Sequence, residues 1–336
     1  MSRKTRNAAA FAAVLLAFAS LFNTCSAAGQ IDPLRYVPPD ARGVVFVNAR
    51  ELGDMGALGS IASFSAELAR NRGINVLEDF EKEKINIDKD IDAVVISITD
   101  GSWCAAAAGR FDPEAFYAWE KEKAAKRNIN AEENYKGCRL IKDDEGNWSA
   151  VLDAKVTISS PDPALAKRLV DLHKGTTAPM AEDSPLLARM RNCKDQTIWF
   201  TMNPNQAGLP ATEPAKKTSA LSLFLGSIDP ASIKSATAWS KITNEAVSLH
   251  SVIMYDGPES AAAAQTVLRS TVNVINGLFR TMADPDPAVN DAARDLASAI
   301  KIDVNGPKAT VDATVKASLI STLGNAFTRW ANRPRQ

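Results

Sequence analysis

Only two histidines, His173 and His250, could supply imidazole chemistry in this chain of 336 residues. Two isolated histidines cannot build a three-histidine metal site, and no His-Glu-x-x-His pattern occurs. The pattern predicts that His173 lies near a helix end, where the helix dipole favours a cation, and that His250 lies in a strand. We therefore predict structural roles for both, and no catalytic, cofactor-binding or metal-binding residue.

Carboxylate side chains are the second set of residues that could catalyse a reaction or bind a metal ion. Asp100 and Asp112 flank one predicted strand, and an acid pair at a sheet edge would suit general acid–base catalysis. A second acidic stretch has the oxygen ligands that Ca²⁺ prefers, namely Asp284, Asp286, Asn290 and Asp291. The alternative for this stretch is a helix–loop–helix junction in which Asp286 caps the helix that begins at Pro287.

Charge and motifs exclude several classes of protein. The chain has 39 basic and 39 acidic residues, which leaves no basic footprint for nucleic acid. No Gly-x-Ser-x-Gly elbow, Walker loop, dinucleotide-binding glycine pattern or Cys-x-x-Cys pair occurs. No cofactor is therefore expected.

The first 28 residues have the three parts of a secretory signal peptide. A basic start precedes an apolar run over Ala8–Phe22, and small residues follow at Ser26–Ala28. The apolar run is shorter than the roughly 20 residues that a permanent membrane helix needs. We expect a mature protein that begins at Gly29, is exported to the periplasm or secreted, and has 36 basic and 39 acidic residues, because the leader holds three basic residues and no acid.

Cys25 leaves two alternatives open. Lipidation at this cysteine would anchor the protein, although Thr24 and Phe22 stand where lipoprotein signals favour small and leucine-like residues. An uncleaved leader would also act as an anchor. Membrane contact is expected only in these two cases.

Three further cysteines, Cys104, Cys138 and Cys193, remain after cleavage. An oxidising compartment permits disulfides, and Cys104 with Cys138 is the favoured pair because both fall in predicted strands of the same half. The alternative is three small, buried, apolar side chains.

Apolar periodicity predicts eleven strands and eight helices. The strands are expected at Gly43–Asn48, Ile91–Thr99, Trp103–Gly109, Gly137–Lys142, Asn147–Asp153, Lys155–Ser160, Thr197–Met202, Ile233–Lys241, Ala246–Tyr255, Lys301–Val304 and Ala309–Val315. The helices are expected at Arg50–Arg72, Asp112–Arg127, Ala164–His173, Pro185–Cys193, Ala220–Leu225, Gly257–Ala283, Pro287–Ala299 and Ala317–Ala331. The loop 203–218 exceeds the usual connection length and suits either a binding loop or a surface excursion.

The order of these elements repeats, which predicts an α+β fold of two tandem, duplicated units. Each unit is expected to be a mostly antiparallel sheet with helices packed on one face. The segment 175–184, rich in Thr, Pro and Ala, places the units at residues 29–175 and 176–336. Two unrelated α+β domains, or one continuous sheet, are the alternatives.

The segment from Tyr36 to Ala41, Tyr-Val-Pro-Pro-Asp-Ala, precedes the strand Val44–Asn48 and then Glu51-Leu52. This arrangement resembles exported bacterial proteins of unknown function that open with a Pro-x-Asp-Ala, strand and helix signature. The resemblance implies an envelope location and repeated α+β units, and it carries no catalytic residues.

We therefore expect a non-enzymatic envelope protein that binds or scaffolds a protein or envelope component. One alternative is an envelope hydrolase or ligand-binding enzyme with an acid-based site between the units, using Asp100 and Asp112. Another is a periplasmic small-molecule receptor, which the antiparallel pattern disfavours.

Overall fold

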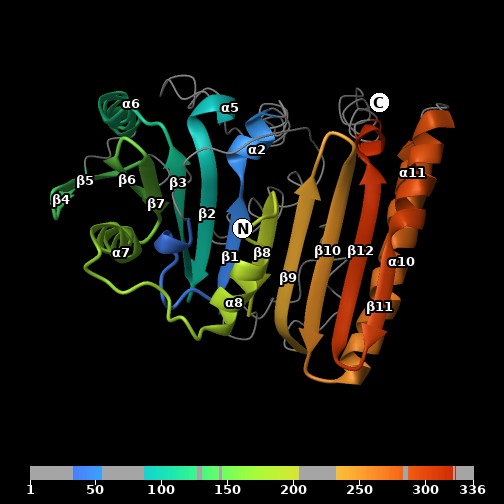
Figure 1. Ribbon diagram of the computed structural model, residues 1–336. Coiled ribbons are helices and arrows are strands. Elements are labelled where there is room, and N and C mark those ends of the chain that lie inside the picture. Colours follow the sequence, from blue (N-terminus) through green and yellow to red (C-terminus); the bar gives the residue numbers. More distant parts are fainter. Residues whose placement is uncertain are drawn as a thin grey trace.

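The computed structural model describes residues 33–54, 87–126, 131–143, 146–203, 232–282, 287–320 and 322. Within these ranges the chain forms one antiparallel sheet of twelve strands (Figure 1). In chain order the strands are β1 (Gly43–Val47), β2 (Ile91–Thr99), β3 (Ser102–Gly109), β4 (Glu132–Tyr135), β5 (Cys138–Lys142), β6 (Trp148–Asp153), β7 (Val156–Ser160), β8 (Ile198–Met202), β9 (Ile233–Ile242), β10 (Ala246–Tyr255), β11 (Lys301–Asn305) and β12 (Lys308–Lys316). The helices are η1 (Pro33–Tyr36), α2 (Ala49–Asp54), α5 (Ile87–Asp90), α6 (Pro113–Lys126), α7 (Pro163–Lys174), α8 (Pro185–Asn192), α10 (Pro258–Met282) and α11 (Pro287–Ala299).

The strand order has the same form in both directions from the middle of the sheet. β1 and β8 pair antiparallel at the centre, with Val45 opposite Phe200. Outward from β1 come β2, β3, β7 and β6, and outward from β8 come β9, β10, β12 and β11. A long helix, α6 or α10, follows the third strand of each half. The first half adds β4 and β5 after this helix, whereas the second half adds α11.

All strands of the two halves belong to one continuous sheet. The predicted division between residues 175 and 176 falls in the connection between α7 and α8. That division remains a prediction, because sheet continuity does not fix where one folding unit ends.

One face of the sheet, here called the α7 face, is covered by α7 over the strands of the first half and by α8 beside β8. A row of directly paired residues crosses this face, comprising Trp199, Phe46, Val95, Ala106, Ile158 and Ala150. These side chains belong to one apolar cluster with the buried residues of α7 and α8. Helix α7 contributes Leu165, Ala166, Leu169, Val170 and Leu172.

The opposite face, here called the α10 face, is covered by α6 in the first half and by α10 and α11 in the second. Tyr117 of α6 packs with Val151, and Ala264 of α10 packs with Ala309. The prediction that helices pack on one face is therefore wrong. Strands β1 and β2 carry apolar residues on both faces, so burying them requires cover on both sides.

Each of the eleven predicted strands is present, with ends within one residue of the prediction. The prediction missed β4, whose sequence Glu-Glu-Asn-Tyr lacks an apolar pattern. Most of the predicted helix 50–72, the helix 220–225, most of the loop 203–218 and the basic end of the chain lie outside the described residues. Among the described helices, none is both long and apolar enough to cross a bilayer.

Candidate functional site

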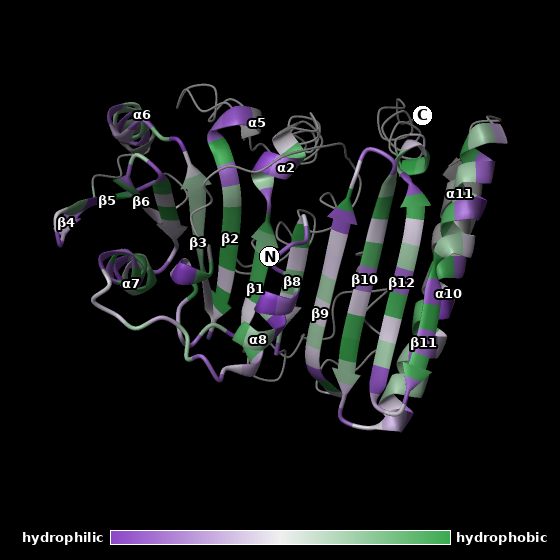
Figure 2. Cartoon of the chain, in the orientation of Figure 1, coloured by the Kyte–Doolittle hydropathy of each residue, from purple (hydrophilic) through white to green (hydrophobic). Residues whose placement is uncertain are grey.

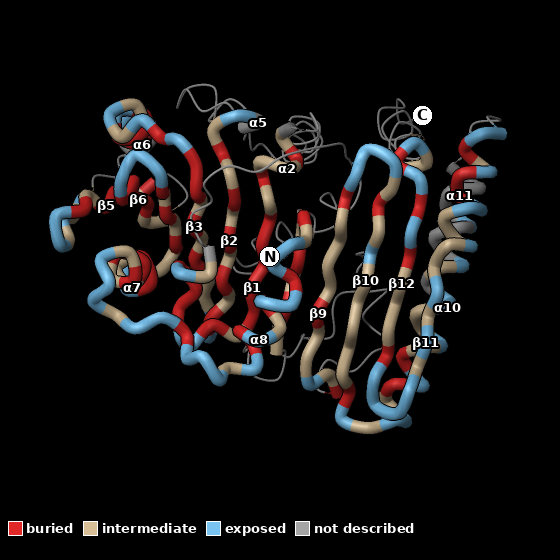
Figure 3. Tube along the Cα trace, viewed as in Figure 1, coloured by how far each residue is buried: buried red, intermediate tan, exposed pale blue. Residues whose placement is uncertain are grey.

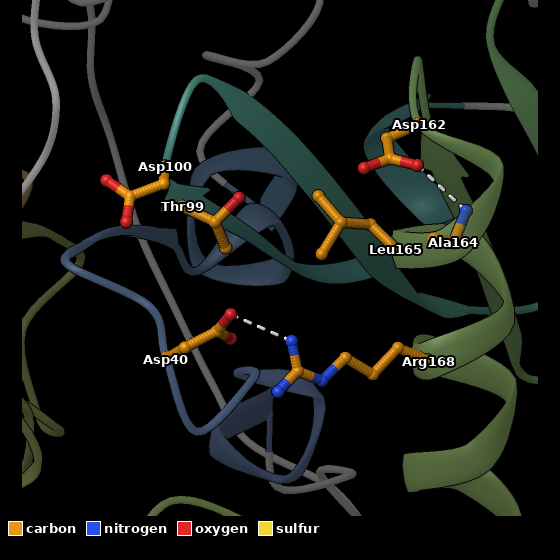
Figure 4. Close-up of a pocket in the computed structure, with 7 residues that line it drawn as sticks. All are labelled: Asp40, Thr99, Asp100, Asp162, Ala164, Leu165 and Arg168. Atoms are coloured by element: carbon orange, nitrogen blue, oxygen red, sulfur yellow. Dashed lines mark hydrogen bonds and ion pairs between the residues drawn. The ribbon is translucent and has the colours of Figure 1, made fainter.

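A surface recess of about 260 Å³ lies where three segments of the first half meet (Figure 4). These segments are the turn before β1, the β2–β3 hairpin and the first turns of α7. The lining residues are Asp40, Thr99, Asp100, Asp162, Ala164, Leu165 and Arg168. Three carboxylates and one guanidinium make the lining acidic, so the recess suits a cationic group or a hydrogen-bond donor.

The sequence fixes α7 at the recess through its caps. The Asp162 carboxylate accepts a hydrogen bond from the Ala164 amide at 2.8 Å, and Pro163 takes the first helical position, which needs no amide donor. Gly175 ends the helix with φ of 69°, a left-handed conformation that glycine adopts without steric cost. One acidic group of the recess is therefore held by the helix itself.

The other acidic groups of the recess are held by arginines. Arg168 Nη1 donates to Asp40 Oδ2 at 2.8 Å, which joins α7 to the Pro-Pro-Asp-Ala segment. Arg42 forms an ion pair with Asp100. Because each of the three carboxylates has a local partner, the recess acts as a junction between three segments of the first half.

A thiol lies close to this junction but is not a nucleophile. Burial, and then the charge of Asp40, raise the pKa of Cys104 to about 12, with Arg168 opposing the change. Burial likewise raises the pKa of Cys193 to about 11. Thiols with such values stay protonated at neutral pH, whereas thiol nucleophiles react as thiolates.

Cys104 and Cys138, the pair expected if a disulfide forms, are not joined. Both thiols are buried and free, and strands β7 and β6 lie between their strands β3 and β5. Three strand spacings amount to about 14 Å, whereas a disulfide needs Cα atoms within about 7 Å. The alternative of small buried side chains fits all three cysteines.

The acid pair of Asp100 and Asp112 does not form. The two residues lie at opposite ends of β3, and a strand of this length spans roughly 27 Å. Asp112 instead accepts hydrogen bonds from the amides of Glu114 and Ala115 at 3.0 and 3.1 Å, as the cap of α6. The acid-based site proposed between the two units therefore loses its predicted pair.

The predicted calcium ligands are only partly described. Asp284 and Asp286 lie outside the described residues. Asn290 lies in α11, as does Asp291, which pairs with Arg294 at 2.9 Å. In the part of the chain that the structure describes, no three His, Cys, Asp or Glu side chains are placed to share a metal ion.

His173 packs at the C-terminal end of α7. Its Nδ1 lies 3.1 Å from the Tyr36 hydroxyl, and the two rings stack with centroids 6.1 Å apart. Burial lowers its pKa, and Arg35 and Lys174 act in the same direction, whereas Asp153 opposes them. The ring thus joins η1 to α7, and its burial disfavours the cation that the sequence had suggested at this helix end.

A second candidate region lies on the α7 face of β9, β10, β12 and β11, here called the open surface. Among the described residues no helix covers it, and Figure 1 shows these strands face on. His250 pairs with Asp312, and its ring centroid lies 4.1 Å from that of Trp239. The central row of the open surface comprises Trp239, His250, Asp312 and Lys301.

Sequence reasoning placed His250 in a strand but missed the partners that make this row. Trp239 is half-buried because its inner side packs against the first-half core, and the Asp312 side chain is 45 % exposed. The alternation of polar residues along β12 is the signal that could have indicated an exposed face.

Neither a protein-family model nor a curated protein sequence matches the chain. Its described architecture is similar to solved structures of TP0453. Crystal form I of TP0453 has a TM-score of 0.50 at 10% identity, covering 89% of this chain and 98% of that chain. Crystal form III has a TM-score of 0.48 at 9% identity, covering 88% and 99%. At such identities the likeness concerns the fold alone.

Proposed function

We propose that this protein is a non-enzymatic component of the cell envelope that binds or scaffolds a protein or another envelope component. The predicted secretory leader supports the location. The observation that carries the binding role is the open surface, where four strands present side chains that no described helix covers.

A polar sheet face alone would be ordinary, because antiparallel sheets often face water on one side. The open surface differs by holding Trp239 on β9, where the surface borders the first-half core. Large aromatic side chains are enriched where proteins bind partners. A rigid platform of strands that holds a half-buried tryptophan among polar groups suits recognition better than simple solvation.

We also propose that the two halves arose by duplication of one α+β unit. The matching strand orders on either side of the β1–β8 pair support this origin, as does the long helix after the third strand of each half. The expected result is that an experimental structure superposes β1, β2, β3, β7, β6 and α6 on β8, β9, β10, β12, β11 and α10. Halves that fail to superpose in this order would refute the duplication.

Photo-crosslinking in intact cells tests the binding role. A photoreactive amino acid replaces Thr314, an exposed residue of the open surface, and in a matched control it replaces Lys155, an exposed turn residue of the first half. We expect a discrete higher-mass adduct from position 314 only. Equal adducts from both positions, or none from 314, would refute a protein partner at this surface.

A further inference from the structure

The chemistry of the open surface also points to a class of ligand. We propose that it binds a glycan chain, with Trp239 as the stacking platform and the polar side chains around it as partners for sugar hydroxyls. This inference rests on the proposed binding function, because it assigns the ligand of the same surface.

Trp239 is held from both sides along its row. Trp199 lies directly opposite it on β8, and its ring also meets the His250 ring at an interplanar angle of 42°. His250 is fixed in turn by its pair with Asp312. The indole is therefore preorganised, and it remains partly exposed. One face of a pyranose ring is lined by C–H groups, which pack on an aromatic face.

Side chains that can bind sugar hydroxyls lie on the strands beside Trp239. Asp312 can accept from sugar hydroxyls, Lys301 can donate to them, and Thr310 and Thr314 can do both. Adjacent strands place these groups about 4.8 Å apart across the sheet. A linear glycan lying across the strands could therefore present each successive sugar to a new set of partners.

The dimensions and composition of the surface favour a glycan over a protein. Four strands of up to nine or ten residues cover roughly 500 Å², whereas a stable protein interface buries about 800 Å² on each partner. Besides Trp239, the described apolar side chains of this face are few, mainly Val252 and Met254. An interface with a protein would need a larger apolar centre.

The charges of the open surface do not suit a ligand with closely spaced negative charges. Lysines and aspartates both occur on this face, with Asp303 directly opposite Thr310 and Asp312 directly opposite Lys301. Aspartates among the lysines would repel closely spaced phosphates. Neutral hydroxyls, in contrast, can bind to both kinds of charged group.

Binding of defined sugars to the full leaderless chain tests this proposal. The probes are the β-1,4-linked tetramers of glucose and of N-acetylglucosamine, measured by calorimetry, and purified peptidoglycan sacculi, measured by co-sedimentation. We expect at least one probe to bind. We expect Trp239→Ala to weaken that binding by about tenfold or more, and Trp239→Phe to retain most of it.

Leu249→Ala is the matched control. Leu249 is 44% exposed and precedes His250 on β10, but its side chain projects from the α10 face. This variant is expected to bind as the parent does, and thermal melting confirms that all variants fold. Glycan binding that Trp239→Ala leaves unchanged would overturn the proposal.

The two proposals fail in different ways. If none of the three probes binds while position 314 still crosslinks to a protein, the glycan inference is overturned and the binding function stands. If no probe binds and position 314 gives no adduct, both are overturned.

Discussion

The α7 face is built differently in the two halves of the sheet, although the strand orders match. Across β3, β7 and β6 the paired residues are Ala106, Ile158 and Ala150. Across β10, β12 and β11 a row of paired residues on the same face holds Val252, Thr310 and Asp303. Apolar side chains accept helix α7, whereas a hydroxyl and a carboxylate would lose their hydration beneath such a helix. Side-chain chemistry, not strand order, therefore decides which half receives a cover.

Burial follows this difference (Figure 3). Ile158 is 1% exposed, whereas Thr310 is half-buried. Fully burying one large aliphatic side chain contributes roughly 1.5–3 kcal/mol, and α7 brings several. Figure 2 shows the alternation of hydropathy along β10 and β12, as expected for strands with one apolar face. The first half gains stability from both faces, whereas no described helix covers the α7 face of β9, β10, β12 and β11 in the second half.

A reciprocal swap tests this comparison and has the largest expected effect. Ile158→Thr removes apolar volume and buries a hydroxyl beneath α7, so we expect it to lower the free energy of unfolding by about 2–3 kcal/mol. Thr310→Ile adds an apolar group to a half-exposed position, where a change within about 0.5 kcal/mol is expected. Urea denaturation measures both variants.

Equal losses in the two variants would contradict the comparison, because they would mean that Thr310 is as enclosed as Ile158. A change in the denaturant slope without a change in midpoint would report on the denatured state instead. Val156→Ala serves as a second probe of the covered half, where the lost methyl groups should also destabilise.

The strands were predictable because the signal is local. Most residues of Ile91–Thr99 are apolar, which indicates a strand. The following Asp100-Gly101 forms the turn that reverses the chain, and Gly101 has a φ of 75°. The single sheet was less accessible, because the pairing of β1 with β8 joins residues about 150 positions apart and no local pattern encodes it. The prediction that helices pack on one face of the sheet failed for the same reason. An apolar run in a strand does not show which helix covers each of its two faces.

The candidate sites were likewise predictable only where the signal is local in the sequence. Asp40 and Arg168 are separated by 128 positions, so only the fold could show that they meet. Asp162, in contrast, caps α7 beside Pro163, and this pattern of Asp followed by Pro is local to the sequence. The open surface had a local signal that was not used, since Lys308–Lys316 alternates polar and apolar residues along its whole length.

The recess offers a way to sharpen the comparison, because its ion pair links α7 to the segment before β1. Arg168 and Asp40 are 33% and 54% exposed, so water screens the pair. We expect a double-mutant cycle with Arg168→Met and Asp40→Asn to give a coupling energy of about 0.5–1 kcal/mol. Arg294→Met with Asp291→Asn, a helix-surface pair, is the control and should give about 0.3 kcal/mol. A coupling energy above about 1 kcal/mol, the upper range for exposed ion pairs, would mean that water is excluded from the recess.

His173 gives the smallest expected effect and tests how α7 is joined to η1. Its folded-state pKa lies below the ordinary value of 6.5 because burial disfavours the imidazolium. The unfolded chain therefore takes up the proton first, so the stability is fully present above pH 6.5 and falls as pH drops through the folded-state pKa. Titration of the His173 ring by NMR measures the shift, and His173→Gln should remove this part of the pH dependence of unfolding. Asp153→Asn removes a carboxylate that raises the pKa, so it should depress the pKa of His173 further. A pKa above 6.5 in the folded protein would contradict this prediction, because it would mean that the attraction of Asp153 outweighs burial.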